Sequence, residues 1–281
     1  LMFQRCIKES KEFKYHWRCK EQKLTHLCFA DDLMVFCHGN SGSIKVVKKA
    51  MDEFANSAGL VTNLAKSHIF FGNVKEPFKR KILRILPFVE GKLPMKYLGI
   101  PLVSTKLFIR DCKGFIDKVK NRVNDWKNKS LSYAGRLQLI STVLASLPVY
   151  WASVMLLQKG IIKEVEKIMR NFLWNSGQNS KGIAKVSWND ICKPKKSGGL
   201  GLKNLHDWNI ALLSSRIWKI ISGHDSLWVK WVKFYHLEGR SFWDVGAKNK
   251  MSWSWRNLLK IRPFLRDSFY TQIGNGENTF M

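Results

Sequence analysis

The stretch LTHLCFADDLMVFCH, residues 24–38, contains two short apolar runs that meet at Asp31 and Asp32. Side chains on each run alternate between two faces, which is typical of two β-strands joined by a turn. Adjacent carboxylates repel each other unless cations neutralise them, and an Asp-Asp pair without glycine is poor chemistry for a tight turn. The stretch therefore predicts a β-hairpin that presents Asp31 and Asp32 as metal ligands, with an ordinary exposed turn as the alternative.

Carboxylates at a hairpin tip are suited to nucleotidyl transfer. Two Mg²⁺ ions about 4 Å apart would activate a primer hydroxyl and stabilise the leaving pyrophosphate, and carboxylates on rigid strands would hold them. The chain of 281 residues also carries 48 Lys and Arg against 21 Asp and Glu, a net charge of +27. Such a surface repels itself and indicates a polyanionic partner, which is nucleic acid more often than an anionic membrane.

The sequence around the hairpin predicts an α+β region. Residues 1–23 are polar and basic with few apolar anchors, and we expect a loop there. Ser43 is placed to cap a helix that runs to about Ala58, and Gly59 occupies the position of a left-handed C-cap. Three further elements are predicted, namely a strand over residues 66–72, a basic helix over 77–86 and a brief strand within 94–102.

The remaining sequence predicts a mainly α-helical region. Apolar residues at helical spacing predict one helix through Phe115 and Trp126, a second from Ser132 to before Pro148, and a third over 162–173. The stretch SGQNSKG, residues 176–182, resembles a linker. Five aromatic residues beyond it recur at helical intervals, which favours core packing over nucleic-acid stacking. They are Trp208, Trp218, Trp228, Trp231 and Tyr235.

Several classes of protein and site are disfavoured. No apolar run reaches the roughly 18 residues that span a bilayer, and the N-terminal sequence lacks the apolar core of a secretory signal. Six scattered cysteines do not suggest a disulfide framework, so we expect an intracellular location. A zinc site of His16, Cys19, His26 and Cys28 is a weak alternative to Cys28 as a core residue. The loop KPKKSGGLG, residues 193–201, lacks the Walker pattern, so ATP binding is not predicted.

Three ordered motifs resemble those of one known family. FADD, residues 29–32, followed by an apolar strand, resembles the catalytic hairpin of reverse transcriptases in the form found in non-LTR (LINE-type) retrotransposons. GLVTNLAKSHIFFG (59–72) and KYLGIPL (96–102) resemble the next two motifs of that family, in the same order. The similarity continues through stretches that look like plant members and extends from Leu24 to about Ile221.

This resemblance implies a domain organisation and a set of partners. It implies a partial polymerase palm over 1–103, a mainly helical thumb-like region over 104–176 and a Trp-rich basic connection over 177–281 that precedes a zinc-binding region. The palm, with its antiparallel strands and helices, gives an α+β fold class. An RNA template, a DNA primer and a dNTP are the implied partners, with Mg²⁺ as the cofactor and no membrane. The oligomeric state stays open.

The resemblance also assigns roles to individual residues. Asp31 and Asp32 would be the catalytic metal ligands, and Lys66 would act near the pyrophosphate as a general acid. The alternatives are a solvated lysine at position 66 and a simple turn glycine at position 99. The implied primer grip consists of Tyr97, Leu98 and Gly99.

Two parts of the family's site have no counterpart in this sequence. The family takes a further carboxylate from an upstream palm strand, but only Glu9, Glu12 and Glu21 precede the hairpin, and none lies in an apolar run. The fingers have no room either. We therefore expect a fragment of an RNA-directed DNA polymerase that is inactive as an isolated chain, located inside the cell, in the nucleus. A non-catalytic, basic nucleic-acid-binding remnant is the second hypothesis.

Overall fold

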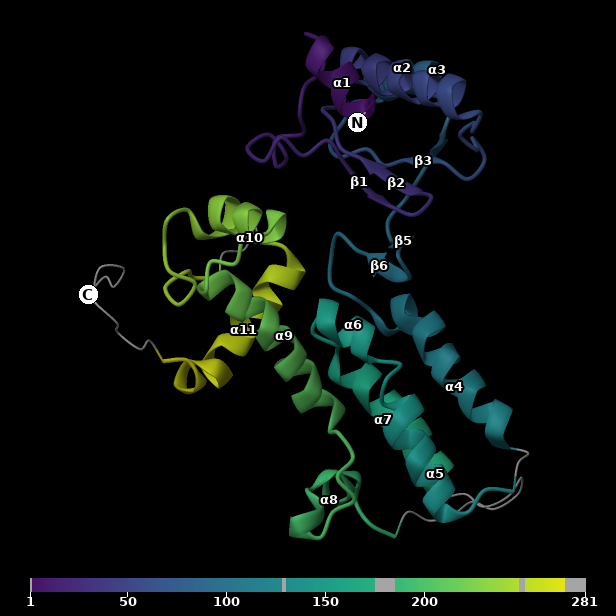
Figure 1. The fold of residues 1–281 in the computed structure, drawn as a ribbon, viewed down its shortest axis with the longest axis vertical. Helices are drawn as coiled ribbons and strands as arrows, with labels where there is room; N and C mark the ends of the chain where they lie inside the picture. Colours follow the sequence, from purple (N-terminus) through teal and green to yellow (C-terminus); the bar gives the residue numbers. More distant parts are fainter. Residues whose placement is uncertain (1, 128–129, 175–184, 248–250, 271–281) are drawn as a thin grey trace. The chain divides into compact units, whose positions relative to one another are not determined.

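The computed structural model describes residues 2–127, 130–174, 185–247 and 251–270. The chain divides into two compact units (Figure 1). Unit 1 contains Leu1–Met95 together with Asp225–Gly239, and unit 2 contains Lys96–His224 and Arg240–Met281. Short paired strands accompany helices that make up most of the structure, so the predicted α+β class is confirmed.

Unit 1 combines small sheets with helices. Strands β1 (His26–Phe29) and β2 (Asp32–Val35) form an antiparallel hairpin, and β3 (His68–Ile69) pairs in parallel with β4 (Val89–Glu90). The helices are α1 (Met2–Glu9), α2 (Ser41–Ala58), α3 (Glu76–Ile85), α10 (Leu227–Val232) and the π-helical turn η4 (Lys233–Leu237). Figure 1 shows α1, α2 and α3 together above the β1–β2 hairpin.

The core of unit 1 lies between its first three helices. Helix α2 contacts both α1 and α3, and the most deeply buried side chains include Val47, Ala50 and Ile82. The prediction of a loop over residues 1–23 is wrong at its start, because α1 buries Cys6 and Ile7 against this core. A few buried apolar residues within one turn are enough for a short helix that is stabilised by tertiary packing.

The ends of α2 explain its length. Asn40, and not Ser43 as predicted, is the N-cap, because its side chain accepts a hydrogen bond from the Ser43 amide. The Ser43 hydroxyl is fully buried and instead accepts a hydrogen bond from the Lys14 amide at 2.9 Å. The predicted C-cap is confirmed, since Gly59 has φ of 69° and its N–H donates to the Ala55 carbonyl.

Unit 2 is mainly helical. The paired strands β5 (Met95–Tyr97) and β6 (Ile100–Leu102) stand at its start, with Met95 still counted in unit 1. The three helices predicted for the middle of the chain are present. They are α4 (Lys113–Lys127), α5 (Tyr133–Leu139) continued by the π-helical η2 (Ile140–Leu144), and α7 (Lys159–Trp174). The other elements are η1 (Ile109–Cys112), α6 (Val149–Val154), α8 (Trp188–Cys192), η3 (Lys195–Ser197), α9 (Leu205–Ile221), α11 (Trp253–Leu265) and η5 (Arg266–Ser268).

Apolar residues of α4 to α7 and α9 form the core of unit 2. Val119, Leu144 and Val165 are completely buried in it. The predicted linker at 176–182 lies outside the described residues. Core packing is wrong for Trp218, which is 52% exposed and stacks on Phe269 with ring centroids 5.6 Å apart.

One helical segment among the described residues, Tyr133–Val154, is long and apolar enough to cross a membrane by length and composition alone. Arg136 interrupts its apolar sequence, and Ile140, Leu144 and Trp151 are buried in the core of unit 2. The absence of a membrane partner therefore stays a prediction.

Candidate functional site

The β1–β2 hairpin is formed as the sequence predicts. His26 pairs with Val35 at its open end and Phe29 with Asp32 at its closed end, so Ala30 and Asp31 form the turn. Ala30 has φ of 51°, a left-handed conformation that costs an L-residue roughly 1–2 kcal/mol. Residue 30 is therefore a strained position next to Asp31, and sequence reasoning did not single it out.

The two faces of the hairpin differ in their surroundings. On one face Val35 packs on the core of unit 1, and the His26 ring lies 5.4 Å from the Phe3 ring. On the other face the Leu27 and Phe29 side chains are 38% and 62% exposed. The prediction of Cys28 as a core residue is wrong, because this side chain is exposed near the tip.

Asp31 and Asp32 are both exposed at the hairpin tip. Among the residues that the structure describes, neither carboxylate has a side-chain hydrogen bond or an ion pair within 4.0 Å, so both are free to take a cation. Carboxylate oxygens are hard ligands that suit Mg²⁺ in kind. Nowhere in the described ranges do three His, Cys, Asp or Glu residues gather as a metal-binding group. The hairpin thus offers two carboxylates and, within those ranges, no third one.

Lys66 lies in a turn of unit 1, just before β3. Its backbone amide donates a hydrogen bond to the Asn63 side-chain oxygen at 3.1 Å, which fixes the local turn. The Lys66 side chain is exposed. No ion pair joins it to Asp31 or Asp32 within the described part of the chain, so its role stays a prediction.

Tyr97, Leu98 and Gly99 form the tip of the β5–β6 hairpin in unit 2. Leu98 and Gly99 have φ of 49° and 78°, which is the backbone of a type I′ turn. The Leu98 carbonyl accepts a hydrogen bond from the Tyr150 hydroxyl at 2.9 Å, so α6 supports the turn. A Cβ atom added to Gly99 would meet no described atom within 4 Å, so the surface of this glycine is open. Its contact with a primer stays a prediction.

The weak zinc alternative has little geometric support. The His16 Nδ1 and Cys19 Sγ atoms are 3.9 Å apart, but the His26 ring nitrogen lies 2.8 Å from the Thr25 hydroxyl. The Cys28 thiol donates to the Ala30 carbonyl at 3.7 Å. Each of these side chains therefore has a local partner.

The Gly/Lys loop at residues 193–201 is closed on itself. The amides of Gly198, Gly199 and Gly201 donate to the carbonyls of Lys195, Pro194 and Lys193, at 3.1, 3.2 and 3.0 Å. These amides are unavailable to a phosphate. A side chain at position 199 would also drive its Cβ into the Lys193 carbonyl, so glycine is required for this fold of the loop.

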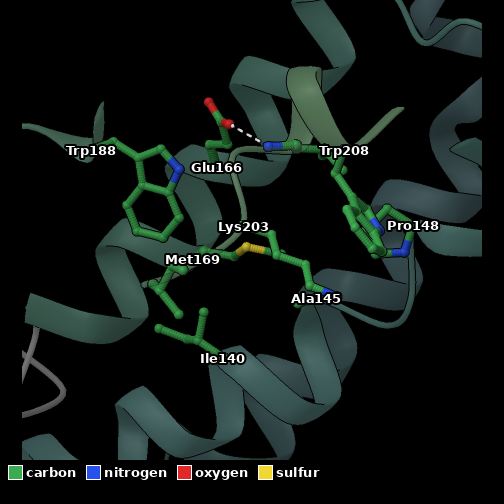
Figure 2. Close-up of a pocket in the computed structure, with 10 residues that line it drawn as sticks. Ile140, Ala145, Pro148, Glu166, Met169, Trp188, Lys203 and Trp208 are labelled. Carbon is green, nitrogen blue, oxygen red and sulfur yellow. Dashed lines mark hydrogen bonds between the residues drawn. The ribbon is translucent and has the colours of Figure 1, made fainter. Parts of the chain in front are cut away.

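Glu166 is one of the residues that line a small cavity in unit 2 (Figure 2). The volume of this cavity is about 20 Å³, which is room for roughly one water molecule. The Glu166 carboxylate accepts a hydrogen bond from the Leu205 amide at 3.4 Å, and burial raises the pKa of this carboxyl. Sequence reasoning missed Glu166, whose only signal is an acid beside the buried Val165. The cavity is too small for a nucleotide.

The chain is similar to known proteins over part of its length. Residues 1–102 match the family model of reverse transcriptase (RNA-dependent DNA polymerase). The chain is 37% identical over 145 residues to the Arabidopsis thaliana protein named "Putative ribonuclease H protein At1g65750"; the match covers 51% of this chain and 23% of that protein. It is 30% identical over 135 residues to the uncharacterized mitochondrial protein AtMg00310 of Arabidopsis thaliana, covering 48% of this chain and 88% of that protein.

Proposed function

The chain belongs to the same family as the Arabidopsis protein AtMg00310 and carries a reverse transcriptase segment over residues 1–102, and on this premise we propose that it is part of an RNA-directed DNA polymerase of a non-LTR retrotransposon. Its substrate class would be an RNA template with a DNA primer and a dNTP. In this proposal the palm, thumb-like region and connection occupy residues 1–103, 104–176 and 177–281.

One observation carries this proposal. The β1–β2 hairpin lies inside the matched segment and presents the Asp31 and Asp32 carboxylates, exposed and unpaired, at its tip. The chain has a net charge of +27, yet in the described structure no cationic side chain lies within 4.0 Å of either carboxylate. Two neighbouring carboxylates without a cationic partner repel each other, and a bound divalent metal would relieve that repulsion.

Asp31 and Asp32 would hold a divalent metal, with Mg²⁺ as the expected ion. When bound, such a metal would lower the pKa of the attacking hydroxyl and stabilise charge on the leaving phosphate. The left-handed conformation of Ala30 fixes the orientation of the backbone at Asp31 and Asp32, because a tight two-residue turn allows few other conformations. The hairpin therefore orients the ligands rather than carrying them on a mobile loop.

Lys66 and the β5–β6 tip would contact the nucleic acid. The exposed Lys66 ammonium can donate a proton or a hydrogen bond to a phosphate oxygen. At the β5–β6 tip the open space around Gly99 allows a backbone to approach closely, and Tyr97 and Leu98 precede it. Exposed lysines on many elements would bind the phosphate backbone without reading its sequence.

A second candidate function follows from the number of ligands. The described residues bring two carboxylates to the hairpin tip, whereas a two-metal site needs more. We therefore propose that the chain alone binds nucleic acid and a metal weakly but does not extend a primer. A basic nucleic-acid-binding remnant without chemistry is the alternative that this shortage favours.

Metal binding tests whether Asp31 and Asp32 form a metal site. Mn²⁺ can be titrated into the purified chain and followed by electron paramagnetic resonance, with Asp31→Asn, Asp32→Asn and the control Asp52→Asn. Asp52 is an exposed acid on α2 in the same unit. We expect both hairpin variants to lose binding and the control to retain it; equal binding by all three would refute the metal site.

Primer extension with Mg²⁺ tests the chemistry. We expect no product from the chain alone. Extension that Asp31→Ala abolishes and Asp52→Asn preserves would show that the site is complete, contrary to the proposal.

The proposed location is the nucleus, where target DNA would be reached. All six cysteines are free thiols, which is compatible with a reducing compartment. Imaging of a fluorescent fusion would test this location.

A further inference from the structure

A second surface of unit 1 gathers aromatic rings and an arginine. It contains Trp17 and Arg18 from the loop before β1, and Trp231, Phe234 and Tyr235 from α10 and η4. We call these five residues the aromatic platform. Trp17 is 64% exposed and Phe234 is 50% exposed, so two large rings are open to solvent. None of the five belongs to the residues proposed for chemistry.

The platform is contiguous. The Arg18 guanidinium lies 4.6 Å from the Trp17 ring centroid and 6.0 Å from that of Trp231. The Trp17 and Tyr235 rings meet edge to face at 6.5 Å, and the Tyr235 and Phe234 rings do so at 4.9 Å. The rings and the guanidinium therefore form one surface, with Trp17 and Phe234 as its exposed parts.

Hydrogen bonds hold the platform in place. The Trp231 indole N–H donates to the Arg18 carbonyl at 2.8 Å, and the Tyr235 hydroxyl donates to the Trp17 carbonyl at 2.9 Å. Both hydrogen bonds are accepted by backbone carbonyls, so the Trp17 ring and the Arg18 guanidinium take no part in them and stay available to a ligand. The platform is thus ordered before any ligand arrives, which reduces the entropy lost on binding.

The charge on the platform favours an anion. In the described structure Arg18 has no carboxylate within 4.0 Å, and the exposed Lys20, Lys23 and Lys233 lie on the same loop and helix. The nearby acids are Glu21, Asp225 and Glu238, and Asp225 is already paired with Lys230 at 2.7 Å. Apolar rings beside unpaired cations match a ligand that has both flat faces and phosphates.

We propose that the aromatic platform binds single-stranded nucleic acid by stacking unpaired bases on Trp17 and Phe234, while Arg18 contacts a phosphate. Aromatic side chains within a basic surface are the usual means of binding single strands. Base-paired nucleic acid hides its ring faces and gains little from such a surface. The inference does not depend on whether the chain polymerises, because it uses none of the hairpin carboxylates.

The test measures binding of a fluorescein-labelled oligouridylate of about twelve nucleotides, which is within the site size of one stacking domain, by anisotropy with the full chain. We expect Trp17→Ala and Phe234→Ala each to weaken binding at least about fivefold. Trp218→Ala is the matched control, because Trp218 is a comparably exposed tryptophan in unit 2. Loss of the same size with Trp218→Ala, or no loss with Trp17→Ala, would overturn the proposal.

Salt dependence separates stacking from charge. Trp17→Ala removes no charge, so it should leave the slope of log affinity against log salt unchanged, whereas Arg18→Gln should reduce that slope by about 1. Arg110→Gln is the control, since Arg110 lies 4.8 Å from the Phe108 ring but outside the platform. An unchanged slope with Arg18→Gln would contradict the phosphate contact.

Two further measurements guard against misfolded variants and other occupants. Photocrosslinking of the unmodified chain to an oligonucleotide that contains iodouracil should label the peptide with Trp17; labelling elsewhere alone would refute the assignment. A hairpin duplex of equal length should bind with the same affinity to the native chain and to Trp17→Ala. If Trp17→Ala instead converts a dimer to a monomer in sedimentation and leaves oligonucleotide binding intact, the platform is a contact between copies and the proposal fails.

Discussion

Asn209 on α9 holds the end of α6, and replacing it should destabilise unit 2 strongly. The side chain is completely buried, and its oxygen accepts a hydrogen bond from the Leu157 amide at 2.8 Å. Its nitrogen donates to the carbonyls of Ala152 and Met155 at 2.6 and 3.0 Å. One amide thus satisfies three backbone groups at a helix end, where such groups have no partner within the helix.

The magnitude follows from what Asn209→Ala leaves behind. A net hydrogen bond contributes about 1 kcal/mol, and a buried group left without a partner costs about 1–3 kcal/mol. Three bonds, with at least the Leu157 amide left unsatisfied, give a loss of about 3–5 kcal/mol. Because whole domains are stable by only about 5–15 kcal/mol, this substitution should leave unit 2 marginal.

Urea unfolding followed by circular dichroism measures this loss, with Lys219→Ala on the exposed side of α9 as the control. Hydrogen exchange at the Leu157 amide should accelerate in Asn209→Ala and not in the control. Asn209→Asp provides a second test. The aspartate keeps an acceptor for the Leu157 amide but cannot donate to the two carbonyls when it is ionised. The destabilisation that it causes should therefore become smaller as the pH is lowered and the carboxylate is protonated. A change below about 1 kcal/mol for Asn209→Ala would refute the reasoning.

Two pH effects are also expected. Burial, followed by the nearby charge of Arg18, lowers the pKa of His236 from 6.5 to about 4. The free energy of unfolding of unit 1 should therefore fall by up to about 3 kcal/mol as the pH falls from 6.5 towards 4. The urea midpoint of His236→Gln should depend less on pH across this range than that of the exposed control His224→Gln. Burial raises the pKa of Glu166, so its ionisation opposes folding above that pKa. Glu166→Gln should accordingly raise the urea midpoint at pH 7 but not at pH 3.5, and a larger gain at the acid pH would contradict this account.

Elements whose cause is local are predictable from the sequence. Helix α2 contains the apolar residues that it buries within its own eighteen residues and has its Gly59 cap directly after them; the predicted helix and its C-cap are both confirmed. The hairpin around Asp31 likewise follows from alternation and a turn, and α4 and α7 follow from helical spacing. In each case one stretch of chain contains both the pattern and the residues that end it.

Features that depend on distant partners are not predictable in this way. Helix α1 is stabilised by its contact with α2, and this contact cannot be inferred from the short sequence of α1 itself. Trp218 lies at a helical interval like its buried neighbours, but its partner is Phe269 at the surface. The same limit applies to the candidate site: the sequence identifies the Asp31–Asp32 pair, but not the strained Ala30 or the exposure of Cys28. Hydrophobic periodicity shows which residues share one face of a helix or strand, but not which other element that face packs against.

The segment Asp225–Gly239 belongs to unit 1, although all of Lys96–His224 separates it from the rest of that unit. The bond between Trp231 and Arg18 joins residues 213 positions apart. During synthesis, residues up to Gly239 must therefore leave the ribosome before unit 1 can fold completely. The N-terminal part of unit 1 stays incomplete while the helices of unit 2 emerge. A nascent chain stalled before residue 225 would lack Trp231 and Tyr235, so the backbone at Trp17 and Arg18 would miss the hydrogen bonds that these two side chains donate.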